Sequence, residues 1–295
     1  MKGIVPLAMA LLLDGLFGEP PARLHPVAWM GHLLNWLEAC APCGGPARLL
    51  YGLGVALALP LGWSCLARAV EQRTPWPVQA LLLKPTFAGR ALLQAGRRVE
   101  VALEASDLAQ ARAELRSLVS RPTSSLDAPL IAAAAIESTA ENLVDSWLAP
   151  LLAYSVFGLG GAYAYRAVNT ADAMWGYRTP HYEQLGKAAA RLDDLLNFVP
   201  ARLGALVLCA VAGQSWQAAL TTWLRDGFKT ASPNAGQTMA CAAGALGVRL
   251  EKEGHYVLGA HARLPAASDI GRARRLVGRA IGVTAALTLL ARSRD

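Results

Sequence analysis

Three carboxylates recur at four-residue intervals in the segment IESTAENLVDSWLAP, residues 136–150: Glu137, Glu141 and Asp145. Each four-residue step along an α-helix turns the side chain by only about 40°, so the three acids are expected on one stripe, where like charges repel. A solvated helix face is one explanation. The other positions are apolar, however, and the segment leads into a hydrophobic run, where an ionised group needs a cation, a partner or water. The stripe is therefore a candidate functional site.

A second polar region lies between Arg166 and Arg202. It contains two sets of oxygen-bearing side chains at helical spacing: Asn169 with Asp172, and Asp193 with Asp194 and Asn197. Each set is expected to converge on one ligand, because residues three or four apart are neighbours on a helix. Carboxylate and amide oxygens are the ligands that Mg²⁺ prefers, usually while the ion also contacts phosphate. The alternative is that the two aspartates pair with nearby Lys187, Arg191 or Arg202.

Two turns rich in Gly and Pro complete the candidates. The stretch GEPPARLHPVAWMG, residues 18–31, carries His25, which is either a hydrogen-bonded structural histidine or a ligand. The stretch SPNAG, residues 232–236, is either a helix-capping turn or a tight loop that presents backbone N–H groups to an anion.

The composition predicts that these groups belong to a membrane protein. Of the 295 residues, 54% are hydrophobic and 17% are charged, whereas an average soluble domain has about a quarter charged residues. Four apolar runs approach the roughly 20 residues that span a bilayer: 3–17, 49–67, 147–165 and 205–224. A fifth run, 280–291, is shorter. We expect an all-α, polytopic integral membrane protein with about four to five membrane helices and one domain over residues 1–295.

The net charge of +7 is concentrated in two segments, 68–121 and 225–279. By the positive-inside rule we expect these basic loops in the cytoplasm and the chain in the cell (inner) membrane. Apolar residues at helical spacing between 87 and 119, with an N-cap at Ser106 and Asp107, predict a hairpin of cytoplasmic amphipathic helices. The basic residues lack interleaved aromatic residues, which argues against nucleic acid as a partner.

The acidic stripe is expected on a helix from about residue 128 to 150. Asp127 is a good N-cap, Pro129 is tolerated in the first turn, and Pro150 is expected to kink the helix.

No Walker A, dinucleotide-binding GxGxxG, HExxH or GxSxG pattern occurs. What remains is a membrane-embedded polar site, which suits a phosphate- and Mg²⁺-handling enzyme or a transporter.

In the same order and over most of the chain, seven stretches resemble motifs of the CobD/CbiB family of cobalamin biosynthesis: LLLDGLFGEPPARLHPVAWMG, KPTFAGRALL, RPTSSLD, AAIESTAENLVDSWLAPL, YRAVNTADAMWGY, ARLDDLLNFVPARL and SPNAGQTMACAAGALGVRL. Four positions depart from the family pattern: Glu19, Pro85, Pro122 and Ala173. The matching positions supply the candidates for binding substrate and phosphate: Asp14, His25, Lys84, Arg121, Thr123, Ser124, Arg166, Asn169, Asp172, Asn197, Arg202, Ser232 and Asn234.

The resemblance implies an integral membrane adenosylcobinamide-phosphate synthase. Such an enzyme joins aminopropanol or its phosphate to the free propionate of adenosylcobyric acid by an amide bond, with ATP and Mg²⁺. The corrinoid is therefore a substrate. The lipid bilayer and other late cobalamin-assembly membrane enzymes are further expected partners. Since a carboxylate does not form an amide at neutral pH without activation, an acyl phosphate is expected in a site shielded from water.

On this basis we assign the catalytic roles to Glu137, Glu141, Asp145 and Asp194. Mg²⁺ is expected on Glu137, Glu141, Asp193 and Asp194, where the cation would screen the repulsion between the acids. The best candidates to hold phosphates are Lys84, Arg121 and Arg166. Glu141 has a second possible role, which is to deprotonate the attacking ammonium.

Two other classes of protein stay open. An intramembrane prenyltransferase also uses acidic helices to hold Mg²⁺ and a pyrophosphate, and a corrinoid or cation transporter also uses intramembrane carboxylates. If the first two apolar runs form a hairpin, residues 18–31 and 166–200 lie outside and residues 84–145 inside. A single site then requires contact at membrane depth or a buried or re-entrant apolar run, and we favour the second.

Overall fold

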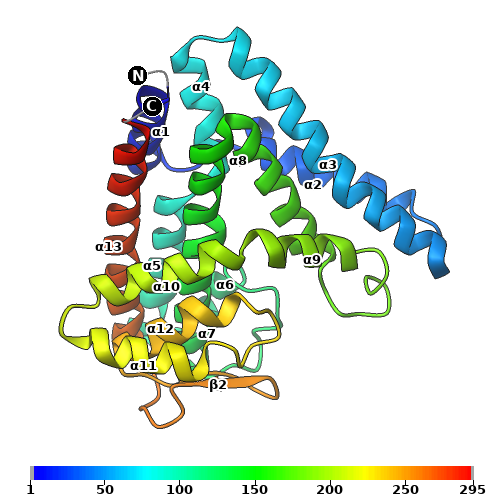
Figure 1. Cartoon of the computed structure of the whole chain (residues 1–295). Coiled ribbons are helices and arrows are strands. Elements are labelled where there is room, and N and C mark those ends of the chain that lie inside the picture. Colours follow the sequence, from blue (N-terminus) through cyan, green and yellow to red (C-terminus); the bar gives the residue numbers. More distant parts are fainter. Residues whose placement is uncertain (1–2, 294–295) are drawn as a thin grey trace. The chain divides into compact units, whose positions relative to one another are not determined.

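The computed structural model describes residues 3–293 and consists almost entirely of helices (Figure 1). Within this range the only sheet is an antiparallel hairpin of β1 (Leu250–Lys252) and β2 (Tyr256–Leu258), in which Lys252 pairs with Tyr256. The predicted all-α fold class is confirmed.

The chain divides into two compact units, each assembled from separate segments. Among the described residues, the first comprises 3–88, 149–197 and 287–293, and the second comprises 89–148 and 198–286. One domain over residues 1–295 stays a prediction.

The first unit is organised around the long helix α8. Its elements are α1 (Ile4–Phe17), η1 (Ala22–Leu24), α2 (Pro26–Ala39), α3 (Gly45–Arg73), α4 (Trp76–Leu83), η2 (Lys84–Thr86), α8 (Ala149–Trp175) and α9 (Lys187–Leu196). Helices α2, α3 and α9 all pack against α8, while α1 packs against α4. The packing of these helices therefore positions the polar residues near the ends of α1, α8 and α9.

The second unit has a buried helix, α12, at its centre. Its elements are α5 (Gly89–Glu104), α6 (Leu108–Leu115), α7 (Ala128–Leu143), η3 (Val144–Leu148), α10 (Phe198–Val211), η4 (Gly213–Ser215), α11 (Trp216–Asp226), α12 (Ala235–Leu246), the hairpin and the greater part of α13 (Ala267–Arg292). Helices α7, α10 and α11 all contact α12, from which every residue except Ala235 is buried. Its small side chains let these neighbours approach closely.

Local sequence signals located several helix ends correctly. The carboxylate of Asp107 accepts a hydrogen bond from the N–H of Gln110 at the start of α6, which packs against the amphipathic α5, so the predicted helical hairpin is confirmed and its cytoplasmic location stays a prediction. The carboxylate of Asp127 accepts from the N–H of Leu130 at the start of α7. Both are N-caps of the expected kind.

The acidic helix departs from the predicted geometry near its end. Instead of a kink at Pro150, residues Val144–Leu148 form one turn of π-helix, and Pro150 lies just beyond it in α8. The break in helical geometry comes later, at Gly158, with φ of 69°. The N–H of the next residue, Leu159, donates to the carboxylate of Glu71 on α3, and this bond compensates for the interruption.

Two helical stretches of residues 3–293 are long and apolar enough to span a membrane: Gly45–Arg73 and Ala128–Trp175. A third candidate appears if α9 and α10 count as one broken span, whereas α1 is shorter. The apolar run 205–224 is interrupted at Gly213, whose φ of 61° ends the helix. The run 280–291 continues an arginine-rich helix, α13. A polytopic membrane protein agrees with these helices, but the predicted four to five spans are not confirmed.

The start of α13 is fixed by a buried carboxylate. Asp269 accepts hydrogen bonds from Arg263 at 2.7 Å, from Arg272 at 2.8 Å and from the N–H of Ala266 at 2.9 Å. Burial alone would raise the pKa of Asp269, but these donors lower it from 3.8 to about 2. Since the pKa is lower in the folded chain, the stabilisation is complete above about pH 4 and is lost as the pH falls through about 2.

The variant Asp269→Asn should lower the free energy of unfolding at pH 7 by about 1–3 kcal/mol, because two arginines lose their counter-charge. The loss should shrink between pH 4 and pH 2, where the wild-type carboxylate is itself protonated. Thermal unfolding in detergent, followed by circular dichroism, measures both effects. Asp127→Asn is the control, because asparagine also caps helices well. A loss that is independent of pH would contradict this account.

Candidate functional site

The acidic stripe borders a small cavity in the second unit. The cavity has a volume of about 150 Å³, and its polar lining includes Arg121, Glu137, Glu141, Lys252 and Tyr256. Helix α7 supplies the two acids, the segment before it supplies Arg121, and the β-hairpin supplies the last two residues. Two carboxylates and two cations therefore face one hollow, which suits a ligand that carries both signs of charge.

Glu137 is the most deeply buried acid of this cavity, with 5% of its surface exposed. One of its oxygens, Oε2, lies 3.3 Å from Nη2 of Arg121. The other, Oε1, and the Nε of Arg121 are buried without a hydrogen-bond partner. Unsatisfied buried polar atoms are rare because each costs about 1–3 kcal/mol. One open acceptor and one open donor thus border the same cavity.

Tyr256 brings a hydroxyl group to this cavity. Burial and the nearby carboxylates of Glu137 and Glu141 raise the pKa of Tyr256, so its hydroxyl stays protonated at neutral pH. Lys252 sits opposite Tyr256 in the hairpin register. Both residues come from the stretch LEKEGHY, whose sequence carries no recognised motif, and sequence reasoning missed them.

Asp145 does not line this cavity. The prediction of a single stripe assumed a continuous α-helix through Glu137, Glu141 and Asp145. The helix changes to a π turn at Val144, and a π turn alters the angle between successive side chains. Only the first two acids of the stripe are brought together here.

The element RPTSSLD is held mainly by structural contacts. The hydroxyl of Thr123 is buried and donates to the backbone oxygen of Arg112, whose Nε in turn donates to the oxygen of Leu126. Ser124 is exposed. Of the three candidates in this element, only Arg121 borders the cavity.

The late turn SPNAG folds onto Arg202. Its guanidinium donates to Oδ1 of Asn234 at 2.8 Å and lies 3.7 Å from the centre of the Phe198 ring. The N–H of Asn234 donates to the hydroxyl of Ser232, and the N–H of Gly236 donates to Thr230. Because these N–H groups already have partners, the geometry favours a helix-capping turn over an anion-binding loop.

In the first unit, Lys84 joins three titratable side chains from the start of the chain in one cluster. The ammonium of Lys84 lies 3.1 Å from Oδ1 of Asp14 and 2.5 Å from Oε1 of Glu19, whose Oε2 lies 2.7 Å from Nε2 of His25. His25 also caps α2 through its Nδ1. Burial raises the pKa of the Glu19 carboxyl, whereas the hydrogen bonds from His25 and Lys84 lower it by a larger amount. The pKa of Glu19 is therefore below its ordinary value.

This cluster changes the expected role of Lys84. Its charge is already balanced by two carboxylates, and 5% of its surface is exposed. A phosphate would have to displace at least one of these partners. Phosphate binding by Asp14, His25 and Lys84 stays a prediction, and the contacts point to a structural role.

The two adjacent aspartates of α9 have different surroundings. Asp193 is buried, and its oxygens accept from the amides of Asn169 at 3.3 Å and Asn197 at 2.9 Å. Arg166 donates to Asn169, and Tyr165 donates to Asn197. This chain of hydrogen bonds joins α8 to α9 and fixes the candidates Arg166, Asn169 and Asn197 in place.

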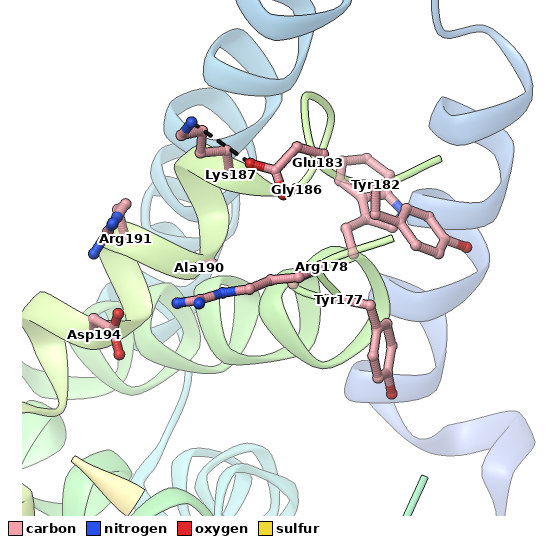
Figure 2. A pocket seen from close by; sticks show the side chains of 11 residues that line it. Tyr177, Arg178, Tyr182, Glu183, Gly186, Lys187, Ala190, Arg191 and Asp194 are labelled. Carbon is pink, nitrogen blue, oxygen red and sulfur yellow. Dashed lines mark ion pairs between the residues drawn. The ribbon is translucent and has the colours of Figure 1, made fainter. Parts of the chain in front are cut away.

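Asp194 lines a separate cavity of the first unit, of about 290 Å³ (Figure 2). Arg178, Lys187 and Arg191 line the same cavity, and sequence reasoning did not assign them to a site. Asp172 does not line this cavity. The Oδ1 of Asp172 lies so close to Gly176 that a side chain at position 176 would collide with this oxygen. Asp194 thus borders a cavity whose lining does not include Asp193, and a shared ligand for the two aspartates stays a prediction.

Among residues 3–293, no three His, Cys, Asp or Glu side chains gather closely enough to hold a metal ion by themselves. Mg²⁺ often needs only one or two carboxylates, with water and phosphate oxygens as its other ligands. The open Oε1 of Glu137 beside Glu141 suits that arrangement. Both oxygens of Asp193 already accept from amides, which makes it a poorer ligand.

Comparison with known proteins places this arrangement in a family. The family model described as CobD/Cbib protein matches residues 7–284. The chain belongs to the CobD/CbiB family. It is 43% identical over 273 residues to "Cobalamin biosynthesis protein CobD" of Dehalococcoides mccartyi, covering 88% of this chain and 87% of that protein.

Two further relatives of the CobD/CbiB family are similar along most of their length. "Probable cobalamin biosynthesis protein CobD" of Methanothermobacter thermautotrophicus is 40% identical over 264 residues, covering 88% of each chain. "Cobalamin biosynthesis protein CbiB" of Salmonella typhimurium is 36% identical over 311 residues, covering 98% of this chain and 97% of that protein. No solved structure matches the chain.

The variant Lys84→Met should lower the free energy of unfolding by about 3 kcal/mol or more, because Asp14 and Glu19 would be left without their shared cation. Thermal unfolding in detergent measures the loss. Lys187→Met, at a lysine whose side chain is 56% exposed, is the control and should change stability by no more than about 0.5 kcal/mol. A Lys84→Met protein that folds normally but binds phosphate poorly would contradict the structural role.

The variants Asp193→Asn and Asp194→Asn should separate the two aspartates of α9. Asp193→Asn places an amide where two amide donors need acceptors, so we expect a loss of about 1–3 kcal/mol in unfolding free energy. Asp194→Asn, at the half-buried rim of its cavity, should cost less than about 1 kcal/mol. The measurement is urea or thermal unfolding of both variants side by side, and equal losses would refute the distinction.

Proposed function

We propose that this chain is a membrane-bound synthase of cobalamin biosynthesis. It would join the free propionate carboxylate of adenosylcobyric acid to the amino group of aminopropanol or aminopropanol phosphate, and it would reside in the cell (inner) membrane. Membership of the CobD/CbiB family and the printed names of the relatives support the pathway. The cavity around Glu137 supports the chemistry, because its charges suit a small amine that also carries a phosphate.

The charge pattern of this cavity is the observation that carries the proposal. An amino-alcohol phosphate presents an ammonium and a phosphate a few bonds apart. Glu137 and Glu141 attract the ammonium, while Arg121 and Lys252 attract the phosphate. The open Oε1 of Glu137 and the open Nε of Arg121 each gain a partner. The cations therefore favour the phosphorylated form of the amine.

The size of the cavity limits which substrate enters. About 150 Å³ is well below the roughly 300–1,000 Å³ of sites that enclose drug-sized ligands. The corrinoid ring therefore stays outside, and only its propionate arm reaches the amine.

Amide formation requires a neutral amine and an activated carboxylate. Glu141, which is less buried than Glu137, takes the proton from the ammonium, and Arg121 holds the phosphate so that the nitrogen is oriented toward the acyl carbon. ATP would activate the propionate as an acyl phosphate. Mg²⁺ would neutralise charge on the transferred phosphoryl group.

The direct test incubates the purified chain with adenosylcobyric acid, ATP, Mg²⁺ and either amine, and identifies the corrinoid product by mass spectrometry. We expect the amide, formed more efficiently from aminopropanol phosphate. No amide with either amine would contradict the proposal. Prenyl transfer, or corrinoid uptake into proteoliposomes without chemistry, would favour the alternative classes.

The variant Glu137→Gln should lower kcat/KM for amide formation by about 100-fold or more, because the cavity loses a buried carboxylate beside Arg121. Glu141→Gln should act mainly on kcat, because it removes the proton acceptor. The control is Glu104→Gln, at a carboxylate that is 49% exposed on α5. Unchanged turnover in a correctly folded Glu137→Gln protein would exclude this cavity as the amine site.

A further inference from the structure

The cavity that Asp194 lines has an excess of positive charge. It lies in the first unit between the end of α8, the following loop and α9. Three basic side chains (Arg178, Lys187 and Arg191) and two acids (Glu183 and Asp194) border it. Figure 2 shows the Arg178 side chain extending toward the part of α9 that carries Arg191 and Asp194.

The lining carries one more basic than acidic side chain, and its three basic residues are exposed. Within residues 3–293, Arg178 and Arg191 form no ion pair, and Lys187 has only a 3.7 Å contact with the exposed Glu183. Other basic groups are paired more closely, such as Arg263 with Asp269 at 2.7 Å. Cations that face one hollow repel each other, and an anion between them removes that repulsion.

The start of α9 adds to the same field. The helix begins at Lys187, has no side-chain N-cap and carries no acid in its first turn. Its preceding residue, Gly186, lines the cavity. The positive end of the helix dipole therefore reinforces the arginines, as at many anion sites.

The framework of the cavity is rigid. The Trp175 indole is buried and donates to Glu38 at 3.1 Å. A Cβ atom at Gly186 would lie 1.8 Å from the backbone oxygen of Trp175, so only glycine fits where the loop meets α8. A fixed backbone holds the arginines near a ligand at a lower entropy cost.

We propose that this cavity binds the phosphate groups of a small-molecule ligand. The planar guanidinium groups of Arg178 and Arg191 match phosphate oxygens in pairs, and Lys187 adds a mobile charge. About 290 Å³ holds a diphosphate with part of its organic group. Tyr177, with 42% of its surface exposed, and Tyr182 add aromatic side chains to the same lining.

Two sources supply this chemistry: a nucleotide, and the headgroup of an anionic lipid. We assign the site to a nucleotide, and this assignment rests on the proposed function, which consumes ATP. The phosphate site itself rests only on the charges and geometry of the cavity.

The test uses the full chain in detergent and isothermal titration with three probes: pyrophosphate, ATP with Mg²⁺, and short-chain phosphatidylglycerol. Arg178→Gln and Arg191→Gln should each weaken pyrophosphate and ATP binding about tenfold, and higher salt should reduce the difference. Arg23→Gln is the matched control, because Arg23 is exposed in the same unit and does not line the cavity. Its affinities should stay within about twofold of wild type.

Each outcome has a definite meaning. Arginine-dependent binding of phosphatidylglycerol but not of ATP keeps the phosphate site and changes its source to lipid. Equal affinities of wild type and both variants for all three probes overturn the site. If amide forms with an unchanged KM for ATP in both variants, the assignment of the site to a nucleotide fails and the proposed function stands. If no amide forms but pyrophosphate binding needs the arginines, the proposed function fails and the phosphate site stands.

Discussion

An ionised side chain inside an apolar helical protein loses its hydration, at a cost of several kcal/mol, unless charges or hydrogen-bond donors replace the water. This constraint explains the main internal polar contacts of each unit. Lys84 is shared by two carboxylates, Asp269 is bound by two arginines, and Asp193 accepts from two amides. Each contact joins segments distant in sequence or fixes a helix end, so compensating charge also determines packing.

The cavity around Glu137 departs from this pattern in a way that indicates function. Its carboxylate lies 3.3 Å from Arg121, and within residues 3–293 both side chains keep a buried polar atom without a hydrogen bond. An open acceptor and an open donor on the same cavity add nothing to the stability of the folded chain. A ligand with both signs of charge would satisfy them, and the amine of the proposed reaction is such a ligand.

Hydrophobic side chains serve two purposes in this chain. On α3, a large share of the apolar surface faces outward: Leu50 and Leu61 are 65% and 64% exposed, and only 22% of the most apolar window is buried. On α12, almost every side chain is buried among other helices. An apolar run predicts burial in either protein or lipid, and hydropathy does not distinguish them. This is why 205–224 resembled one span although Gly213 divides it between two helices.

The sequence by itself determined the helical fold class, the caps at Asp107 and Asp127, the acids of the candidate sites and the family. The helices and caps depend on residues a few positions apart, and backbone geometry relates that spacing directly to structure. The family depends on sequence motifs. Only the tertiary structure gave Asp193 and Asp194 different surroundings, left Asp145 outside the lining of the cavity, and brought the β-hairpin to Glu137. Burial and charge pairing depend on which distant segments meet, and spacing along the chain does not specify that.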